Sequence, residues 1–156
     1  MSATATITRE DYLAKLAQQM NERGRNGLQQ RVMSLALGLK RTSYPGLLYY
    51  HTQDSRKCPV GFPDVQIVIP ERERVIVAEL KRERQRPTVE QAAWLDAYAV
   101  ADAVEVYLWR PQHLLSGVIH RLLCDVPVSD EPTGRWLEGG VVGDPYSSPR
   151  KRGGAP

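Results

Sequence analysis

Apolar residues recur every three or four positions in two stretches near the start of the chain. The first stretch runs from Tyr12 to Met20, follows Thr8 with an acid three positions later, and ends before Gly24. The second occupies residues 28–39 and is followed by a Tyr-Pro-Gly turn sequence. Spacing of this kind gives a helix one apolar face, while Thr before it and Gly or Pro after it start and end the helix. The pattern therefore predicts two helices separated by a short break.

The three short segments that follow are rich in Val, Ile, Leu and aromatic residues, which is the composition of strands. They cover residues 47–51, 64–69 and 74–81, and the polar connection between the last two is short enough for a hairpin. We therefore expect the second and third segments to be adjacent strands. Tyr49 and Tyr50 are neighbours on the first segment, so the two-residue period of a strand predicts one buried and one exposed tyrosine.

Another helix is predicted from Thr88, because Thr88 and Gln91 form a Thr-x-x-Gln capping box ahead of an apolar face. Residues 104–109 then have the composition of a strand, and Pro111 opens one last helix. The passage from the preceding strand through this helix to 104–109 is long enough for a parallel crossover, which should be right-handed.

The order of these elements predicts an α/β fold, with a mixed β-sheet between helices in three layers. Residues 1–27 are expected to form an N-terminal helical extension and residues 28–124 the main domain. From residue 125 the periodicity is lost, and the Pro- and Gly-rich segment 125–156 contains a basic stretch at 150–152. We expect this segment to be a C-terminal tail that is partly disordered.

Composition excludes several classes of protein. The chain has 156 residues, 42% hydrophobic and 25% charged, which is enough for one domain with its own core. Cys58 and Cys124 form no Cys-x-x-Cys pair, which argues against a zinc module or a disulfide scaffold. No apolar run approaches the roughly 18 residues of a membrane span, and the first residues do not resemble a secretion signal. We therefore expect a cytoplasmic protein with no membrane partner.

The net charge permits a polyanionic partner without requiring one. Lys and Arg total 21 against 18 Asp and Glu, a net charge of +3. Arg82, Arg84 and Arg86 are crowded into one short segment. Clusters like this are usually solvated faces unless they flank a chemical site.

Charged residues stand within the apolar strand segments, and three of them are the candidates for chemistry. They are Asp64, at the start of one strand, and Glu79 and Lys81, near the end of the next. The period of a strand places Glu79 and Lys81 on the same face. Charges on a buried strand cost several kcal/mol unless they are paired, bound to a metal or placed in a wet cleft. The pattern therefore indicates a site rather than surface decoration.

Two carboxylates that converge repel each other unless a cation lies with them. Mg²⁺ and Mn²⁺ accept carboxylate and backbone carbonyl oxygens and can hold a phosphate oxygen as well. We therefore expect Asp64, Glu79 and the backbone carbonyl of Leu80 to bind Mg²⁺ or Mn²⁺. Lys81 is then placed to orient or activate a water and to stabilise developing negative charge, which is the chemistry of phosphodiester hydrolysis.

Four short motifs follow one another between residues 28 and 111. They are Gly61-Phe62-Pro63-Asp64, Ala78-Glu79-Leu80-Lys81, Gln91 with Trp94-Leu95, and Val106-Tyr107-Leu108-Trp109-Arg110-Pro111. Together they resemble the virus-type replication-repair nuclease domain (VRR-NUC) of the PD-(D/E)xK superfamily. The resemblance implies a metal-dependent DNA nuclease in residues 28–124, with a restriction-endonuclease-like core. By the same resemblance, Asp64 and Glu79 match the metal-binding acids, Lys81 the catalytic lysine and Gln91 the glutamine of the helix that follows.

The resemblance also carries expectations about substrate and assembly. Small members of this family are similar to junction-resolving enzymes, which implies an endonuclease acting on branched or Holliday-junction DNA in replication, repair or recombination. A small enzyme that must cut both strands often pairs with a copy of itself, so a homodimer is expected. A small-molecule phosphoesterase is less well supported, because the chain has no Gly-rich phosphate-binding motif.

One departure from the family pattern leaves alternatives open. Related nucleases usually contribute an acid from the helix before the first strand, but residues 28–39 contain none. Gln29 or Gln30 could instead bind a metal-bound water. The number of metal ions therefore stays open, and so does a second hypothesis, a DNA-binding module on the same scaffold whose catalysis has decayed.

Further residues are candidates for contact with nucleic acid. They are His51, Ser55, Arg56 and Lys57 in the loop ahead of Asp64, together with Arg82, Arg84, Arg86 and Arg110. A solvated loop explains the first group nearly as well. Contacts from the arginines would make binding weaken steeply with salt. Trp94 is expected to pack in the core rather than to stack on a base.

Overall fold

The computed structural model describes residues 8–21, 27–101, 103–124 and 137–138. The helices and strands occur in the predicted order as far as the fourth strand. In chain order they are α1 (Arg9–Asn21), α2 (Leu28–Thr42), β1 (Leu48–His51), η1 (Ser55–Lys57), β2 (Val65–Ile69), η2 (Pro70–Arg72), β3 (Arg74–Leu80), α3 (Val89–Ala99), β4 (Val104–Trp109), α4 (Pro111–Leu115), α5 (Val118–Cys124) and β5 (Leu137–Glu138), where η marks a single 3₁₀ turn.

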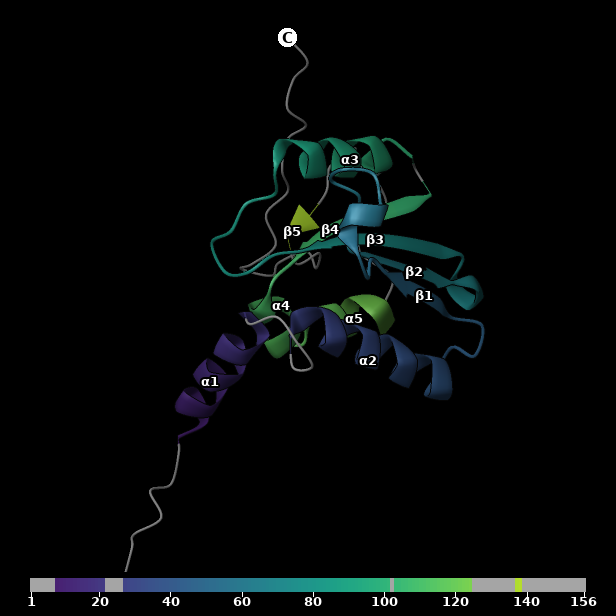
Figure 1. Ribbon diagram of the computed structural model, residues 1–156. Helices are drawn as coiled ribbons and strands as arrows, with labels where there is room; N and C mark the ends of the chain where they lie inside the picture. The colour runs from purple at the N-terminus through teal and green to yellow at the C-terminus, as the bar shows by residue number, and fades with distance from the viewer. Residues whose placement is uncertain (1–7, 22–26, 102, 125–136, 139–156) are drawn as a thin grey trace, which may run out of the picture.

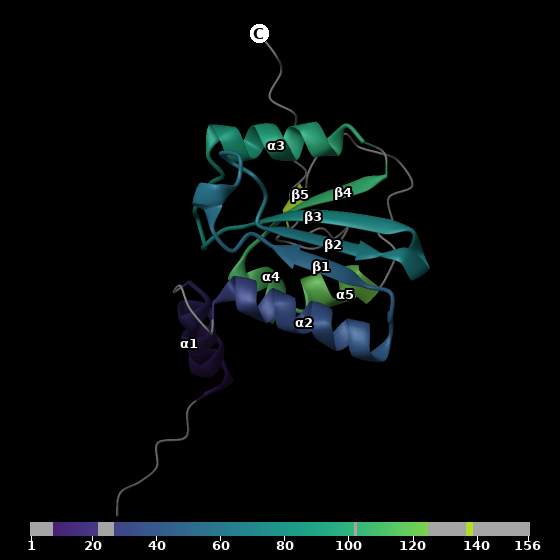
Figure 2. The same ribbon diagram turned by 45° about the vertical axis from the view of Figure 1, so that its right-hand side comes forward.

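The elements form three layers, as the sequence predicts. Figure 1 shows the sheet in the middle, with α3 on one face and α2, α4 and α5 on the other. In the view of Figure 2 the strands are seen side by side between these helices, and α1 lies beside the lower layer. The α/β fold class is therefore confirmed.

The sheet is mixed and its strands lie in the order β1-β2-β3-β4-β5. β1, β2 and β3 are antiparallel neighbours, whereas β3 pairs with β4 and β4 with β5 in parallel. This confirms the hairpin of β2 and β3 and the crossover from β3 through α3 to β4. β5 was not predicted, because it comes from the segment after residue 125, where the sequence shows no periodicity.

Two apolar cores hold the layers together. The larger lies between the sheet and the α2, α4 and α5 layer and includes Val32, Ile67 and Ile119, which are inaccessible to solvent. The smaller lies under α3, where Leu95 packs with Leu108 of β4. Because both faces of β3 and β4 are covered, charged side chains at the ends of these strands have few routes to water.

The prediction of one last helix from Pro111 is wrong, since the structure divides it into α4 and α5. Gly117 lies between the two helices with φ of +80°, a left-handed conformation that ends helices. Its backbone N–H donates to the carbonyl of Leu114 at 3.1 Å. The apolar spacing continues across this break because both short helices face the larger core, so the spacing alone did not reveal it.

The prediction that one of Tyr49 and Tyr50 is buried is also wrong. Tyr49 is 36% exposed and Tyr50 is 51% exposed, and Leu48 beside them is 59% exposed. β1 is the strand at one edge of the sheet, paired only with β2 among the described strands. The exposure of all three residues shows that neither face of β1 is fully covered, although α2 contacts this strand.

Residues 125–136 and 139–156, which make up most of the predicted tail, lie outside the described residues. None of the described helices is both long and apolar enough to cross a membrane. The loop ahead of Asp64 contains the turn η1, where Asp54 accepts a hydrogen bond from the backbone N–H of Arg56.

Candidate active site at one end of the sheet

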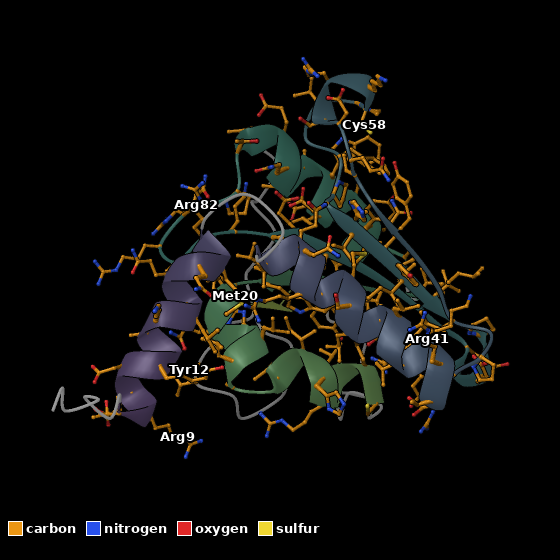
Figure 3. The ribbon with its side chains drawn as sticks, turned by 60° about the horizontal axis from the view of Figure 1, so that its bottom comes forward. Arg9, Tyr12, Met20, Arg41, Cys58 and Arg82 are labelled. Atoms are coloured by element: carbon orange, nitrogen blue, oxygen red, sulfur yellow. The ribbon has the colours of Figure 1, made fainter. Side chains whose placement is uncertain are left out.

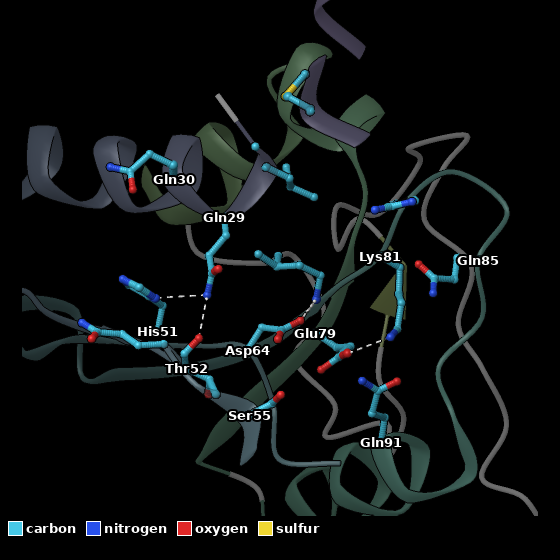
Figure 4. Close-up of a pocket in the computed structure, with 16 residues that line it drawn as sticks. Gln29, Gln30, His51, Thr52, Ser55, Asp64, Glu79, Lys81, Gln85 and Gln91 are labelled. Carbon is cyan, nitrogen blue, oxygen red and sulfur yellow. Dashed lines mark hydrogen bonds and ion pairs between the residues drawn. The ribbon is translucent and has the colours of Figure 1, made fainter. Parts of the chain in front are cut away.

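A pocket of about 670 Å³ lies at the end of the sheet where β1 and β3 finish and β2 begins (Figure 4). Its walls are mostly polar and come from segments far apart in the sequence. They include the last turn of α1 and the first turns of α2 and α3. The lining residues are Met20, Gly27, Leu28, Gln29, Gln30, His51, Thr52, Gln53, Ser55, Asp64, Glu79, Leu80, Lys81, Arg82, Gln85 and Gln91.

Glu79 and Lys81 lie at the end of β3, on the same face, as the strand period predicts. Nζ of Lys81 is 3.1 Å from Oε1 of Glu79. Both side chains are buried, with exposed fractions of 1% for Glu79 and 9% for Lys81. The backbone N–H of Lys81 donates to the carbonyl of Trp109 at 2.9 Å, which extends the parallel pairing of β3 with β4 by one residue. The lysine is therefore fixed by the sheet, although it follows the strand.

Asp64 comes directly before β2 and is held against β3. Its Oδ2 accepts a 2.9 Å hydrogen bond from the backbone N–H of Leu80. This bond brings the Asp64 carboxylate beside Glu79, because Leu80 is the next residue along β3. Three side chains proposed for chemistry, from Asp64, Glu79 and Lys81, thus meet in one pocket (Figure 4).

The residues before Asp64 are packed onto α3. Gly61 has φ of +80°, and a Cβ at this position would lie 2.5 Å from the backbone carbon of Glu90. The Phe62 ring meets the Trp94 ring edge-on at a centroid distance of 5.1 Å. Nε1 of Trp94 also donates to the carbonyl of Val60 at 3.0 Å. Trp94 is half-buried and belongs to neither apolar core, so it does not pack in the core as predicted; it packs on Phe62 and anchors the loop that leads to Asp64.

Gln91 caps α3 and also lines the pocket. Its Oε1 accepts the backbone N–H of Thr88 at 2.9 Å, and its own backbone N–H donates to Oγ1 of Thr88 at 3.3 Å, so both bonds of the capping box are present. Figure 4 shows the Gln91 side chain directed toward Glu79 and Lys81. The cap thus fixes the amide group at the pocket wall.

Gln29 and Gln30 differ in their orientation at the start of α2. Nε2 of Gln29 donates to the carbonyl of Thr52 at 3.2 Å and lies 3.1 Å from Nδ1 of His51. A backbone carbonyl can only accept, which places the amide nitrogen on this side, and Nδ1 of His51 then acts as the acceptor. Both glutamines line the pocket, but Figure 4 shows the Gln29 side chain directed toward His51 and Thr52, whereas the Gln30 side chain points another way along the helix.

The two buried carboxylates perturb each other. Burial, and secondly the Asp64 carboxylate, raise the pKa of Glu79 to about 8, although the Lys81 ammonium opposes this rise. Burial also raises the pKa of Asp64, opposed first by the hydrogen bond from Leu80. A pocket that raises the pKa of two acids is short of positive charge.

A divalent cation fits this donor set. Both carboxylate oxygens of Glu79 are buried, and no backbone group of the described residues hydrogen-bonds to either of them. The Lys81 ammonium group pairs with Oε1 at 3.1 Å. The described residues contain no cluster of three or more His, Cys, Asp or Glu, so the two acids would be supplemented by neutral oxygens such as the Leu80 carbonyl. Hard cations such as Mg²⁺ and Mn²⁺ prefer oxygen donors of these kinds.

The structure brings only some of the predicted nucleic-acid contacts to the pocket. His51, Ser55 and Arg82 line it. Arg56 is instead paired with Asp54, with Nε 3.0 Å from Oδ1. The other predicted residues that lie outside the pocket lining are Lys57, Arg84, Arg86 and Arg110.

Several lining residues were not singled out from the sequence. Thr52 supplies the carbonyl that holds Gln29, and its position directly after a predicted strand was the available signal. Met20 and Gln85 also line the pocket. Met20 belongs to α1, which packs beside α4, and no local pattern connects that helix with the site.

The chain was compared with known protein families, curated proteins and solved structures, and one family matches the region that forms this pocket. The sequence model of the family described as the VRR-NUC domain matches residues 6–112. The match includes every residue that lines the pocket, from Met20 to Gln91. No curated protein matches the chain, and no solved structure matches it.

Proposed function

The chain belongs to the VRR-NUC domain family, a family of nucleases, and from this premise we propose that it is a metal-dependent DNA endonuclease. One observation carries the proposal. The Glu79 carboxylate is buried beside the Asp64 carboxylate, and although Lys81 pairs with it, no backbone group of the described residues hydrogen-bonds to it. A buried acid with this environment is costly in a structural role but suited to holding a cation at a phosphodiester.

Asp64, Glu79 and the backbone carbonyl of Leu80 are the residues that would hold Mg²⁺ or Mn²⁺. When bound, such an ion polarises a phosphodiester and lowers the pKa of a water molecule. Oδ2 of Asp64 accepts the hydrogen bond from the Leu80 N–H, which orients the carboxylate. Its second oxygen, Oδ1, is then available to the ion. The acids therefore act as a fixed pair rather than as mobile surface groups.

Lys81 has a separate role. Its ammonium group is held at the pocket wall by Glu79 and by the pairing of its backbone with Trp109. There it can orient the attacking water and stabilise negative charge that develops on the phosphate. Gln91, directed at the same pair, can donate a hydrogen bond from its amide nitrogen.

Cleavage of plasmid DNA tests this function. We expect the purified chain to cut DNA in Mg²⁺ or Mn²⁺ and to stop cutting when EDTA removes the ion. Asp64→Asn, Glu79→Gln and Lys81→Ala should each lose at least about 100-fold in rate, since each removes a group that acts on the transition state. Glu10→Gln and Lys15→Ala, on the exposed face of α1, are the matched controls. Full activity in Glu79→Gln would overturn the assignment.

We extend the proposal to branched DNA, on the basis of the resemblance to small junction-resolving nucleases. A gel assay with labelled four-way junctions and linear duplexes of the same sequence tests it. Faster cutting of the junction supports a role in replication, repair or recombination. Equal cutting of both substrates contradicts that substrate preference but leaves the nuclease assignment intact.

The edge strand β1 supports a homodimer. Its exposed Leu48, Tyr49 and Tyr50 offer an unprotected edge of the kind that monomeric proteins avoid. Two copies of β1 can pair antiparallel about a two-fold axis at Tyr49, which sets Leu48 opposite Tyr50 of the partner subunit. Light scattering should give twice the chain mass for the parent and for Tyr12→Lys, and a single chain mass for Leu48→Lys. A monomeric parent at tens of micromolar would refute the pairing.

A DNA-binding module without catalysis is the second candidate. It is favoured by one observation, the absence of an acid from α2, where Gln29 and Gln30 line the pocket instead. Gel shifts run beside the cleavage assay separate the two candidates. Binding without cutting in every metal tested would support the module.

A further inference from the structure

The loop between β3 and α3 presents three arginines directly after Lys81. The side chains of Arg82, Arg84 and Arg86 are all exposed. Figure 3 shows Arg82 projecting outward beyond the end of α1. Arg82 also lines the pocket, so the loop begins at the site itself and leads away from it.

This loop is held from the junction of β4 and α4. Nη1 of Arg110 donates to the carbonyl of Arg82 at 2.6 Å and to the carbonyl of Gln85 at 2.7 Å. The backbone N–H of Gln112 donates to Oε1 of Glu83 at 3.0 Å. Bonds from a charged donor are among the stronger hydrogen bonds in proteins. The loop is therefore tied to one short segment by three hydrogen bonds, two to its backbone and one to the Glu83 side chain.

The backbone of the loop is itself constrained. Arg84 has φ of +64°, in the left-handed region that residues with a side chain rarely adopt. Such a conformation persists only where the surrounding structure holds it. A further bond inside the loop, from the N–H of Gln85 to the carbonyl of Arg82 at 3.2 Å, closes the turn. Arg84 lies at the tip of this turn, between the two carbonyls that Arg110 binds.

The same junction also holds the catalytic lysine. Trp109, the residue before Arg110, accepts the backbone N–H of Lys81. One connected segment thus sets the position of Lys81 and of the arginines that follow it. The Arg110 guanidinium group binds backbone carbonyls of the loop. The side chains of Arg84 and Arg86 are instead exposed to solvent.

We propose that Arg110 is a positioning residue, and that it holds residues 82–86 as a preformed rim of arginines for the phosphates of a DNA strand entering the pocket. Arg84 and Arg86 are the residues that contact phosphate. A rim ordered before binding loses less conformational entropy when DNA binds than a loop that must first fold. The inference rests on the proposed function, since it takes DNA as the ligand.

Hydrogen exchange tests the tie without any DNA. Amides 82–86 should exchange faster in Arg110→Gln than in the parent, while Arg84→Gln should leave them unchanged. Arg121→Gln, an exposed arginine on α5, is the matched control for the loss of one charge. If Arg110→Gln does not fold, Glu83→Ala removes a tie from the loop side and should give the same local change. Unchanged exchange in both variants would overturn the positioning role.

Binding of a fluorescein-labelled 20-base-pair duplex, measured by anisotropy at several salt concentrations, tests the rim. The double variant Arg84→Gln/Arg86→Gln should bind severalfold more weakly, and the slope of log K against log salt should fall by about two. Arg110→Gln should also bind severalfold more weakly as a single change, but it should add little to the double variant, because it acts through these arginines.

Additive losses in that cycle would show that Arg110 contacts DNA independently and would overturn the inference. Absence of any DNA binding by the parent chain would instead refute the proposed function. In that case the exchange experiment still reports on whether Arg110 holds the loop, so the two failures are distinguishable.

Discussion

A Cβ added to Gly61 would lie 2.7 Å from the backbone nitrogen of Gln91. The loop before Asp64 therefore approaches the first turn of α3 too closely for any side chain. Together with the ring contact of Phe62 on Trp94, this approach places Asp64 and Gln91 in the same pocket. The Gly-Phe-Pro-Asp motif and the Gln-x-x-Trp motif are thus two sides of one packing contact.

Gly61→Ala should destabilise the protein by at least about 2 kcal/mol, because it combines a left-handed backbone with a clash against backbone atoms. Urea denaturation measures the change. Gly38→Ala is the matched control, since a Cβ there meets nothing within 4 Å and the position is inside α2. That control should gain about 0.5–1 kcal/mol from helix propensity. Equal effects at the two glycines would contradict the packing argument.

Glu79→Gln should stabilise the metal-free protein at pH 8 while abolishing cleavage. The reason is that folding raises the pKa of Glu79 from its ordinary 4.5 to about 8. Between these values the folded state holds a proton that the unfolded state has released, so stability is lost as pH rises from about 5 to 8. For one proton, the free energy of unfolding changes by at most about 1.4 kcal/mol per pH unit.

Thermal denaturation across that pH range, in EDTA, measures this effect. The parent should lose stability toward pH 8, and Glu79→Gln should have a flatter profile. Addition of Mg²⁺ should restore the parent at pH 8 but not the variant, because the variant has lost a carboxylate ligand. If stability depends on pH in the same way in the parent and the variant, the buried Glu79 is not the cause of that dependence.

Gln29→Glu should destabilise the metal-free protein, whereas Gln30→Glu should change its stability by less than about 0.5 kcal/mol. The first substitution sets a carboxylate oxygen against the Thr52 carbonyl that Gln29 now donates to, and adds a third negative charge to the pocket. We expect a loss of about 1–3 kcal/mol. Gln30 also lines the pocket but is exposed, so a carboxylate there stays hydrated. Calorimetric melting of both variants checks the difference, and Mn²⁺ should narrow the deficit of Gln29→Glu.

Arg74→Ala should destabilise the fold by about 3 kcal/mol without changing metal affinity. Arg74 opens β3, at the end of the strand away from the pocket, and is 7% exposed. Its Nε and Nη2 donate to the two oxygens of Glu105 at 2.7 and 2.8 Å, and its Nη1 donates to the carbonyl of Leu122 at 2.8 Å. Denaturation and Mn²⁺ titration of the variant test the two halves of this prediction. A loss of metal binding in the folded variant would contradict the separation of this cluster from the site.

Features that depend on residues a few positions apart could be predicted from the sequence. The strand period placed Glu79 and Lys81 on one face, and their charged groups lie 3.1 Å apart. The capping box at Thr88 and Gln91 forms with both of its hydrogen bonds. Both geometries follow from the covalent repeat of a strand or a helical turn, so no distant contact is needed to establish them.

Other features could not be predicted, because apolar spacing reports only which residues are buried. It did not reveal the break at Gly117, since α4 and α5 bury their apolar residues in the same core. It also failed for Tyr49 and Tyr50, because alternation assumes a covered face and β1 lies at an edge. The position of a strand in the sheet is decided by its partners, not by its own residues.

The fold class and the family followed from the sequence alone, and so did the choice of Asp64, Glu79 and Lys81 as candidates, because these depend on local periodicity and on short motifs. The tertiary contacts were needed to show that Gln29 rather than Gln30 hydrogen-bonds to Thr52 in the pocket, and that Arg110 binds the loop after Lys81. Consecutive residues on a helix point in directions about 100° apart. Which of them faces a site is therefore set by how the cores pack the helix against the sheet.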